Sequence, residues 1–529
     1  MARAVPPAGV SVSAPDLKRR ISLLAAFAAG VLSAAPWAAW GADGSDTPQF
    51  VDVPPGYTVL YKPLVSDLER RTFLFFWQTA NPENGLIPDR YPTPSFASIA
   101  AVGFGLTAYP IGVARHFITR REAQERVLTT LRFLVREPNE HGFFYHFIDM
   151  HTGARANHSE VSTVDTSLLL AGVLFCQSYF DTPDPGDVEI RGLADRIYRR
   201  VDWTWVQPRP PAIALAWTPE DGFSAEDWRG YNEAMLVYLL ALGSPTHPIS
   251  QQAWKLWTST YNEHWGTFYH QTYLGFAPLF GYQYTHVWVD FRGIQDAYMR
   301  AHGLDYFENS RRATYAQRGY AIADPMDWRG YGKNVWGLSA SDGPGPAQEK
   351  YRGKELSFMQ YAARGAAVGG TIDDGTIAPT AAVSSLPFAP EIVLPAMLEM
   401  YHRFGASIYS TYGFKDAFNE SFRAKPTDPI RPGSPGWVDP DYVAIDQGPI
   451  LAMIENYRSR LVWRVMRDNR YIRRGLDRAG FTGGWLSQVQ TLTVERGQAD
   501  ADDTAAVDHA VGAAGTLPRS RAAGDGTNP

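Results

Sequence analysis

Apolar residues recur along most of this chain at the spacing of an α-helix, and they predict helices of two kinds. In the first kind the apolar positions share one face, as between residues 190 and 201, where they repeat at intervals of three and four. In the second kind nearly every position is apolar, as in residues 168–175, 235–242 and 450–454. A helix that is apolar on all sides must be buried on all sides, so we expect the second kind to lie inside the first.

Helices of the two kinds alternate between about residues 63 and 480, which predicts an all-α fold. Hairpins of one inner and one outer helix would close, after about six repeats, into an (α/α)6 barrel, a toroid around one core. An open helical solenoid is the alternative, although the sequence has no fixed repeat period. Long Gly/Pro-rich connections at 324–379 and 412–440 are expected over one face of the barrel, because loops of that length are often functional.

The N-terminal residues predict an export signal. Basic residues at 18–20 precede an apolar run over 21–35 that is too short for a comfortable bilayer span, and the small residues Ala39 and Gly41 suit cleavage after Gly41. We therefore expect a signal peptide at residues 1–41 and a periplasmic or secreted protein. The alternative is an uncleaved N-terminal anchor, and the route of export stays open.

The rest of the chain is expected to form one barrel domain over residues 42–490, followed by a disordered tail over 491–529. The tail has almost no large apolar residues, so it cannot bury enough surface to order itself. We expect the mature protein to have no membrane span and to be a monomer.

The composition and net charge of the chain limit the classes of partner that it can bind. The chain has 529 residues and a net charge of −6, and its hydrophobic fraction of 45% is typical of a soluble globular protein. A mildly acidic balance gives no electrostatic reason to bind phosphate backbones, so we expect no nucleic-acid partner. Cys176 is the single cysteine, which excludes a disulfide within the chain and indicates a small buried apolar residue.

Three acidic clusters lie at or just before predicted inner helices. The first contains Glu160 and Asp165. Ser162 and Asp165 have the spacing of a capping box, so Asp165 has a structural explanation as well as a catalytic one, whereas Glu160 has no helical role. The third cluster, at 373–374, lies in a Gly-flanked loop, where an Asx turn is the structural alternative.

The second cluster centres on Glu233. Asn232 could cap the helix that follows, and the positive end of that helix would lower the pKa of Glu233. A general acid needs a raised pKa, so a catalytic Glu233 requires enough burial, or a neighbouring carboxylate, to outweigh the helix end.

The stretch from Tyr282 to Arg292 mixes aromatic rings with hydrogen-bonding groups. If it is extended, alternate side chains line one face, and such a mixture suits a neutral polyol, since rings stack on sugar faces while polar groups fix hydroxyls. The alternative is that these rings fill the core. The alternating residues are Tyr282, Tyr284, His286, Trp288 and Asp290.

The sequence gives little support for catalysis by a metal or by a nucleophilic side chain. The sequence has no HExxH, CxxC, EF-hand, GxSxG or Walker A motif, and residues 439–441 (Asp-Pro-Asp) are only a weak suggestion of calcium. We therefore expect no metal and no cofactor. Acid and base catalysis by paired carboxylates is the chemistry that remains.

Several short segments of the chain are informative as a set. They are VSTVDT (161–166), GYNEAML (230–236), ALGSPTHP (241–248), HVWVDFRG (286–293), WGLSASDG (336–343), DGTIAPTAA (374–382) and IDQGP (445–449). Taken together, they resemble the glycoamylase-like family, which includes bacterial β-1,2-glucanases and is related to a domain of cyclic β-1,2-glucan synthases. The resemblance covers roughly residues 64–480. A departure at 354–357 interrupts the Gly-rich lead-in expected before Asp373.

The resemblance implies an (α/α)6 barrel and an endo-β-1,2-glucanase that needs no cofactor, with an inverting outcome. It implies catalytic roles for Glu160, Glu233 and Asp165. The alternatives are an exo-acting enzyme that releases sophorose, a transglycosylase, or a glucan-binding protein without catalysis. The substrate-binding residues that we expect are His286, Trp288, Asp290, Arg292, Trp336, Asp374, Thr376 and Asp446.

Overall fold

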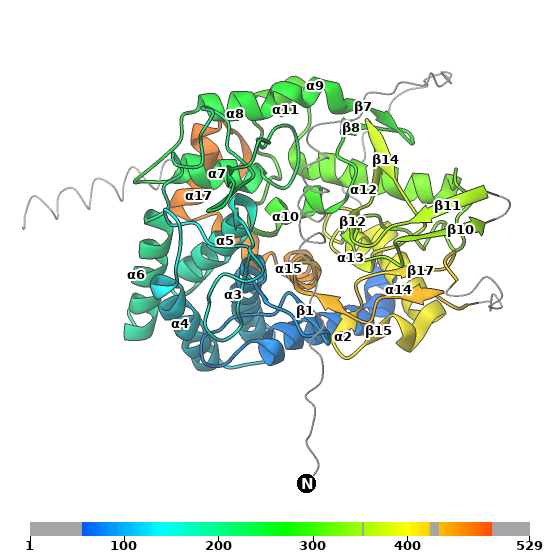
Figure 1. Ribbon diagram of the computed structural model, residues 1–529, viewed down its shortest axis with the longest axis horizontal. Helices are drawn as coiled ribbons and strands as arrows, with labels where there is room; N and C mark the ends of the chain where they lie inside the picture. The colour runs from blue at the N-terminus through cyan, green and yellow to red at the C-terminus, as the bar shows by residue number, and fades with distance from the viewer. Residues whose placement is uncertain (1–54, 352–353, 424–432, 489–529) are drawn as a thin grey trace, which may run out of the picture.

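The computed structural model describes residues 55–351, 354–423 and 433–488. The predicted signal peptide (1–41) and tail (491–529) lie outside these residues. The described part is mainly helical, as predicted (Figure 1). None of its helices has the length and apolarity needed to cross a bilayer.

A set of inner helices contains the segments that are apolar on all sides. Residues 168–175, 235–242 and 450–454 fall within α5, α7 and α15, and every residue of α7 is buried. Contacts between these helices run in the order α3, α5, α7, α10, α15 and back to α3, and α13 packs on α15. The inner helices are α3 (Ile99–Ala114), α5 (Thr163–Tyr179), α7 (Met235–Gly243), α10 (Phe280–Trp288), α13 (Pro379–Val383) and α15 (Ala444–Arg458).

Amphipathic helices pack outside this set. In α6 the predicted apolar face is buried, and α6 contacts both α4 and α5. Likewise α17 packs on α7 and α2 packs on α15. The longer outer helices are α2 (Pro55–Thr79), α4 (Arg120–Arg136), α6 (Pro185–Arg199), α12 (Tyr306–Ala323), α14 (Pro390–Phe404) and α17 (Arg470–Arg478). Shorter ones are α8 (Gln252–Trp257), α9 (Tyr261–His264), α11 (Ala297–Ala301), α16 (Leu461–Met466) and α18 (Gly484–Gln488), with 3-10 turns η1 (Thr258–Thr260) and η2 (Gly405–Ser407).

Short strands lead directly into three of the inner helices. β2 ends at Ser98, where α3 begins, and β4 ends at Ser162, where α5 begins, and in each case the serine side chain caps the helix. β19 runs into α15 in the same way. The N-terminal ends of these inner helices are therefore held in place by strand pairing on one side of the molecule.

These strands pair over long stretches of sequence. β1 (Arg90–Tyr91) pairs with β19 (Tyr442–Val443), β2 (Ala97–Ser98) with β3 (Phe147–Ile148), and β4 (Val161–Ser162) with β5 (Ala216–Thr218), which also pairs with β6 (Gly222–Phe223). The other pairs are β7 (Trp265–Phe268) with β8 (Gln271–Leu274), β9 (Ala340–Ser341) with β12 (Ala362–Ala363), β10 (Ala347–Tyr351) with β11 (Lys354–Phe358), β13 (Gly365–Ala367) with β14 (Gly370–Ile372), β15 (Tyr409–Ser410) with β16 (Gly413–Phe414), and β17 (Phe418–Asn419) with β18 (Trp437–Val438).

The run from Tyr282 to Trp288 is helical, so the extended face considered for it does not form. It belongs to α10, all of whose residues are buried. Alternation of aromatic and polar residues favours a strand only when one face meets solvent, and here the core surrounds the segment. Cys176 is buried, as predicted.

Candidate active site

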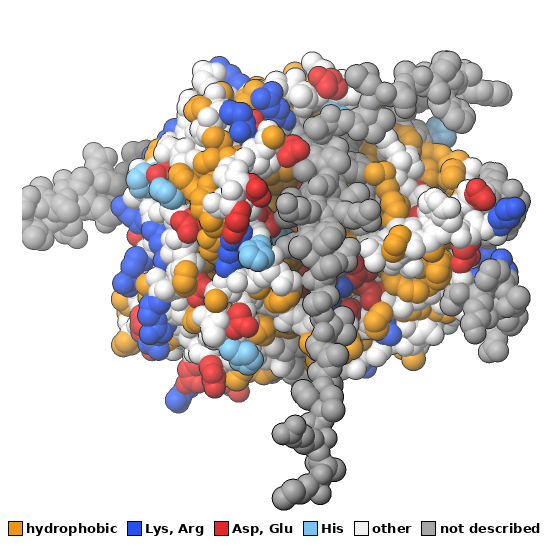
Figure 2. Space-filling model, viewed as in Figure 1, with side chains coloured by type: hydrophobic (Ala, Val, Ile, Leu, Met, Phe, Trp, Pro, Cys, Tyr) orange, Lys and Arg blue, Asp and Glu red, His pale blue; other side chains and the backbone are white. Residues whose placement is uncertain are grey.

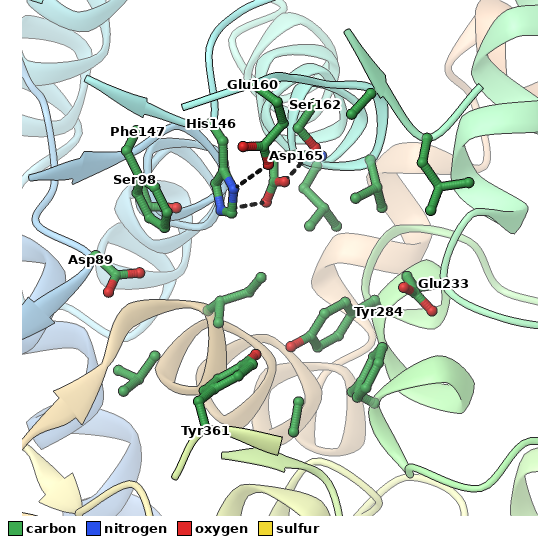
Figure 3. Close-up of a pocket in the computed structure, with 18 of the residues that line it drawn as sticks. Asp89, Ser98, His146, Phe147, Glu160, Ser162, Asp165, Glu233, Tyr284 and Tyr361 are labelled. Carbon is green, nitrogen blue, oxygen red and sulfur yellow. Dashed lines mark hydrogen bonds and ion pairs between the residues drawn. The ribbon is translucent and has the colours of Figure 1, made fainter. Parts of the chain in front are cut away.

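A pocket of about 1100 Å³ lies where the N-terminal ends of α3, α5, α7, α10 and α15 converge (Figure 3). The residues that precede or begin these helices supply most of its wall. All three predicted catalytic carboxylates line it. Its lining includes Asp89, Arg90, Ser98, His146, Phe147, Glu160, Ser162, Asp165, Trp228, Glu233, Phe280, Tyr284, Tyr361, Val443 and Ile445.

One wall carries a histidine between two carboxylates. His146 Nδ1 lies 2.8 Å from Glu160 Oε1, and its Nε2 lies 3.6 Å from Asp165 Oδ1. The Asp165 backbone N–H donates to Ser162 Oγ over 3.2 Å, and the hydroxyl of Ser162 donates to the Asp165 carboxylate. The predicted capping interaction therefore forms, and it holds Asp165 in the pocket wall rather than diverting it from the site (Figure 3).

The charges of this wall follow from its geometry. Burial would lower the pKa of His146, but the carboxylates of Asp165 and Glu160 together raise it to about 9. His146 is then an imidazolium at neutral pH. Burial raises the pKa of Asp165, although His146 and Ser162 oppose that effect. The cation can orient both carboxylates towards the pocket, where a Glu160 oxygen, Oε2, has no hydrogen-bond partner among the described residues.

Glu233 lies across the pocket from this wall (Figure 3). It precedes α7 instead of opening it, because the turn is fixed by Asn232 Oδ1, which accepts from the Ala234 backbone N–H over 3.0 Å. Its side chain is 6% exposed, and its Oε2 has no hydrogen-bond partner among the described residues. Burial, with a smaller contribution from Asp165, raises the pKa of Glu233 to about 7. The condition set above for a general acid is therefore met.

The structure does not bring His286 and Trp288 to the pocket. The side chain of His286 is 1% exposed, and its Nε2 lies 3.1 Å from Ser310 Oγ. The indole N–H of Trp288 donates to Thr107 over 3.0 Å, and its ring stacks on Phe104. Both side chains pack into the core because their helix is surrounded, and neither lines the pocket, so their binding to sugar stays a prediction.

Asp290 and Arg292 also form structural contacts. The guanidinium of Arg292 donates to both Asp290 oxygens, over 2.7 and 2.6 Å, and Arg467 forms a second ion pair with the same carboxylate. Arg292 also lies over the ring of Trp463, 4.4 Å from its centre. Despite burial, these arginines hold the pKa of Asp290 below its ordinary value. Neither residue lines the pocket, and their contacts with sugar stay a prediction.

Trp336, Asp374 and Thr376 stabilise the long connection between α12 and α13. Asp374 accepts two hydrogen bonds from Arg364, over 2.6 and 2.8 Å, and both side chains are almost fully buried. Asn419 donates to Thr376 Oγ1 over 3.0 Å, and Trp336 is fully buried. None of the three lines the pocket, and their binding to substrate stays a prediction.

Asp446 lies behind the pocket wall that Val443 and Ile445 form. Its side chain is buried beside Asp416. Burial raises the pKa of both carboxyls, and the charge of Asp446 adds to the effect on Asp416, so the pair favours holding a proton. Asp446 itself does not line the pocket, although its charge acts on Tyr284 and Tyr361, which do, and its contact with sugar stays a prediction.

A group of carboxylates next to the pocket could hold a cation. Oxygens of Asp342, Asp416 and Asp439 lie within 4.8 Å of one another, and Arg90 forms an ion pair with Asp342. Burial and the neighbouring carboxylates raise the pKa of Asp439, so protons can also relieve the repulsion within the group. The Asp-Pro-Asp segment singled out for calcium contributes Asp439 to this group.

Several pocket residues had no signal in the sequence. His146 is an isolated histidine in a loop, and backbone hydrogen bonds with Glu160 and Ile99 bring it to the site. Asp89, Arg90, Phe147 and Tyr361 come from loops and short strands, and one of these strands, β1, pairs with β19 near the other end of the described chain. Tyr284 is the one residue of the 282–292 stretch that lines the pocket.

Comparison with known proteins identifies the family. The family described as "Putative glucoamylase" matches residues 225–470. The crystal structure of a "putative glucoamylase" from Bacteroides uniformis is 32% identical with a TM-score of 0.70, over 80% of this chain and 98% of that one. The chain therefore belongs to this glucoamylase-like family.

Two relatives have described activities. The endo-β-1,2-glucanase from Chitinophaga pinensis, solved with sophorotriose and glucose, is 28% identical with a TM-score of 0.69, over 80% of this chain and 99% of that one. The exo β-1,2-glucooligosaccharide sophorohydrolase (non-reducing end) of Parabacteroides distasonis is 28% identical over 454 residues. That match covers 80% of this chain, which spans 58% of the length of the relative.

Proposed function

We propose that this chain is a glycoside hydrolase that cleaves internal bonds of β-1,2-glucan. One observation carries the proposal: Glu233 is buried with a raised pKa and faces a pocket whose opposite wall holds Glu160 and Asp165 around His146. A protonated carboxyl opposite ionisable carboxylates is the arrangement that glycoside hydrolysis requires. Relatives that act on β-1,2-linked glucose polymers and oligomers support the substrate.

In the reaction, Glu233 gives its proton to the oxygen of the glycosidic bond as the bond to the anomeric carbon breaks. A water molecule attacks that carbon from the opposite side, and its proton passes to Glu160 or Asp165. The His146 imidazolium orients the two carboxylates and stabilises their charge. Attack by water without a covalent intermediate inverts the anomeric configuration.

We infer that the inner and outer helices form an (α/α)6 barrel. The order of contacts among α3, α5, α7, α10 and α15, which returns to its starting helix, supports this inference. So does the convergence of helix N-terminal ends at the pocket. Export to the periplasm or outside the cell stays a proposal based on residues 1–41.

The share of each relative's length that this chain covers favours the endo mode over release of sophorose. The chain covers 99% of the Chitinophaga endo-glucanase and 58% of the Parabacteroides exo enzyme. Product sizes distinguish the modes: we expect purified protein, without added metal, to shorten linear β-1,2-glucan rapidly to mixed oligosaccharides. Sophorose alone from the start would favour the exo enzyme, and β-1,3- and β-1,4-glucans are the specificity controls.

Glu233→Gln tests the proposal directly. We expect kcat to fall by about 10²–10⁴-fold, since general acid catalysis contributes on that scale. Glu137→Gln is the matched control, because Glu137 is also buried with a pKa raised to about 7 by burial, yet it does not line the pocket. Full activity of a folded Glu233→Gln variant would overturn the assignment.

A further inference from the structure

A second cavity of about 740 Å³ adjoins the pocket at Glu233, which lines both spaces. It shares Trp228, Glu233 and Phe280 with the pocket, so the two spaces meet at the candidate acid. Its remaining lining comes from the turn before α7, from η1 and α9, from β12 and from the residues after β8. These residues are Arg229, Gly230, Tyr231, Asn232, Thr260, Glu263, His264, Gly275, Phe276 and Ala363.

The wall of the second cavity is held by backbone contacts. The Gly230 N–H donates to the Trp257 carbonyl over 2.9 Å, and the Gly275 N–H donates to the His264 carbonyl over 2.8 Å. A Cβ on Gly275 would lie 2.9 Å from the Val368 carbonyl oxygen, so no side chain fits at that point. The cavity is thus a formed feature of the fold, bounded by elements that also position Glu233.

The lining of the second cavity suits a sugar. Trp228, Tyr231 and Phe280 contribute buried aromatic residues to its wall, while the side chains of Glu263 and His264 reach solvent at least in part. Rings that offer apolar faces, next to groups that hydrogen-bond, recognise a neutral hydroxylated ligand. The first pocket has the same kind of lining.

The position of the candidate base decides which sugar belongs in which space. Water attacks the anomeric carbon from the side of Glu160 and Asp165, so the glucosyl unit under attack lies in the pocket, between those carboxylates and Glu233. The oxygen that Glu233 protonates belongs to the departing unit. Chain beyond that oxygen must continue past Glu233, where the second cavity begins.

We propose that the second cavity binds the glucosyl unit on the leaving side of the cleaved bond, with His264 and Glu263 hydrogen-bonding its hydroxyls. This assignment rests on the proposed function and names the part of the substrate that each space receives. It also requires that a productive substrate occupy both spaces at once.

The test separates binding from cleavage by using an inactive background. Glu233→Gln protein, with and without His264→Ala, is titrated calorimetrically with defined β-1,2-glucooligosaccharides of increasing length. We expect His264→Ala to leave the affinity of the shortest unchanged and to weaken, by about 3–10-fold, those long enough to pass position 233, since one hydrogen bond is lost. His264 is partly exposed, so the substitution is compatible with folding.

His402→Ala on the exposed side of α14 is the matched control, because His402 lines neither space. Equal affinity at every length, or an equal loss at every length, would overturn the assignment of the second cavity. If the unchanged protein neither binds nor cleaves any β-1,2-glucan, the proposed function itself fails. If it cleaves the glucan and only the length-dependent loss is missing, the function stands and the second cavity has no sugar.

Discussion

At the scale of single residues, burial and access together decide which carboxylate can act. Glu233 and Glu137 both have a pKa raised to about 7, in each case first through burial. Only Glu233 lines the pocket, so a perturbed pKa alone would not distinguish them. Asp290 and Asp374 are as deeply buried, but arginines lower their pKa values, and they remain charged structural groups.

The raised pKa of Glu233 predicts the alkaline side of the pH profile. Glu233 must be protonated to donate, so kcat/KM for β-1,2-glucan should fall about tenfold per pH unit above a midpoint near 7. Initial rates across pH 5–9 measure this. Activity recovered at pH 6 after incubation at each pH shows whether the fall is reversible titration, and a flat profile to pH 9 would contradict the role.

The sequence predicted which carboxylates lie together better than it predicted the contacts of the other candidate residues. Glu160, Asp165 and Glu233 each precede or begin an inner helix, and the fold brings those helix ends together. Sequence spacing does not reveal ion pairs: Arg364 contacts Asp374 through the hairpins between α12 and α13, and Arg467, at the end of α16, contacts Asp290. The place of His146 in the site likewise depends on contacts between separate segments, which the sequence pattern does not reveal.

At the scale of elements, the strand-to-helix junction is what builds the site. A short strand paired across the chain fixes the residue before the helix, and a serine at that residue caps the first turn. The pattern of apolar positions predicted these helices but not the short strands, since a strand of two residues has no periodicity to detect. It also left α10 ambiguous, because alternating rings and polar groups can be buried in either conformation.

The crossing of α3 and α5 depends on two glycines. A Cβ on Gly172 would lie 2.1 Å from the Gly103 carbonyl oxygen, so Gly172→Ala must separate the helices. We expect a loss of about 2–3 kcal/mol in the free energy of unfolding, measured by urea denaturation. Separation of these helices would also disturb Ser162 and Asp165, so activity should fall with stability.

Gly192 on α6 provides the matched control for that substitution. It is exposed, and a Cβ there would have no atom within 4 Å. Gly192→Ala should therefore raise the free energy of unfolding by about 0.5–1 kcal/mol, because alanine restricts the unfolded chain. A similar change in both variants would show that helix propensity, and not the close crossing, controls the effect.

At the scale of the whole molecule, the first and last parts of the described chain meet in a buried charge cluster. Arg458 of α15 forms an ion pair with Glu69 of α2, and Arg115 donates to Glu455 over 2.5 and 2.8 Å. Both glutamate side chains are fully buried. Alternating inner and outer helices could be predicted from the sequence, but this contact between distant segments could not.

We expect the loss of one partner of this cluster to destabilise the protein, and the loss of both partners to restore much of its stability. Arg458→Met leaves the buried Glu69 beside Glu455 with Arg115 as the remaining cation, so we expect a loss of about 3–5 kcal/mol in the free energy of unfolding at pH 8. Adding Glu69→Gln removes the unpaired charge and should restore much of that loss. Urea denaturation of both single variants and the double variant gives the coupling between the two positions.

The pH dependence of the stability of these variants tests whether the charge of Glu69 causes the penalty. Burial and the charge of Glu455 raise the pKa of Glu69 to about 8 even with Arg458 present, so a Glu69 without that arginine holds its proton more readily still. A raised pKa in the folded state favours folding most at low pH, and that contribution is lost as the pH rises through the folded value. The penalty of Arg458→Met should therefore be smaller at pH 5 than at pH 8, and the double variant should not show this trend. Equal penalties at both pH values would mean that Arg458 stabilises the junction of α2 and α15 by packing, not by its charge.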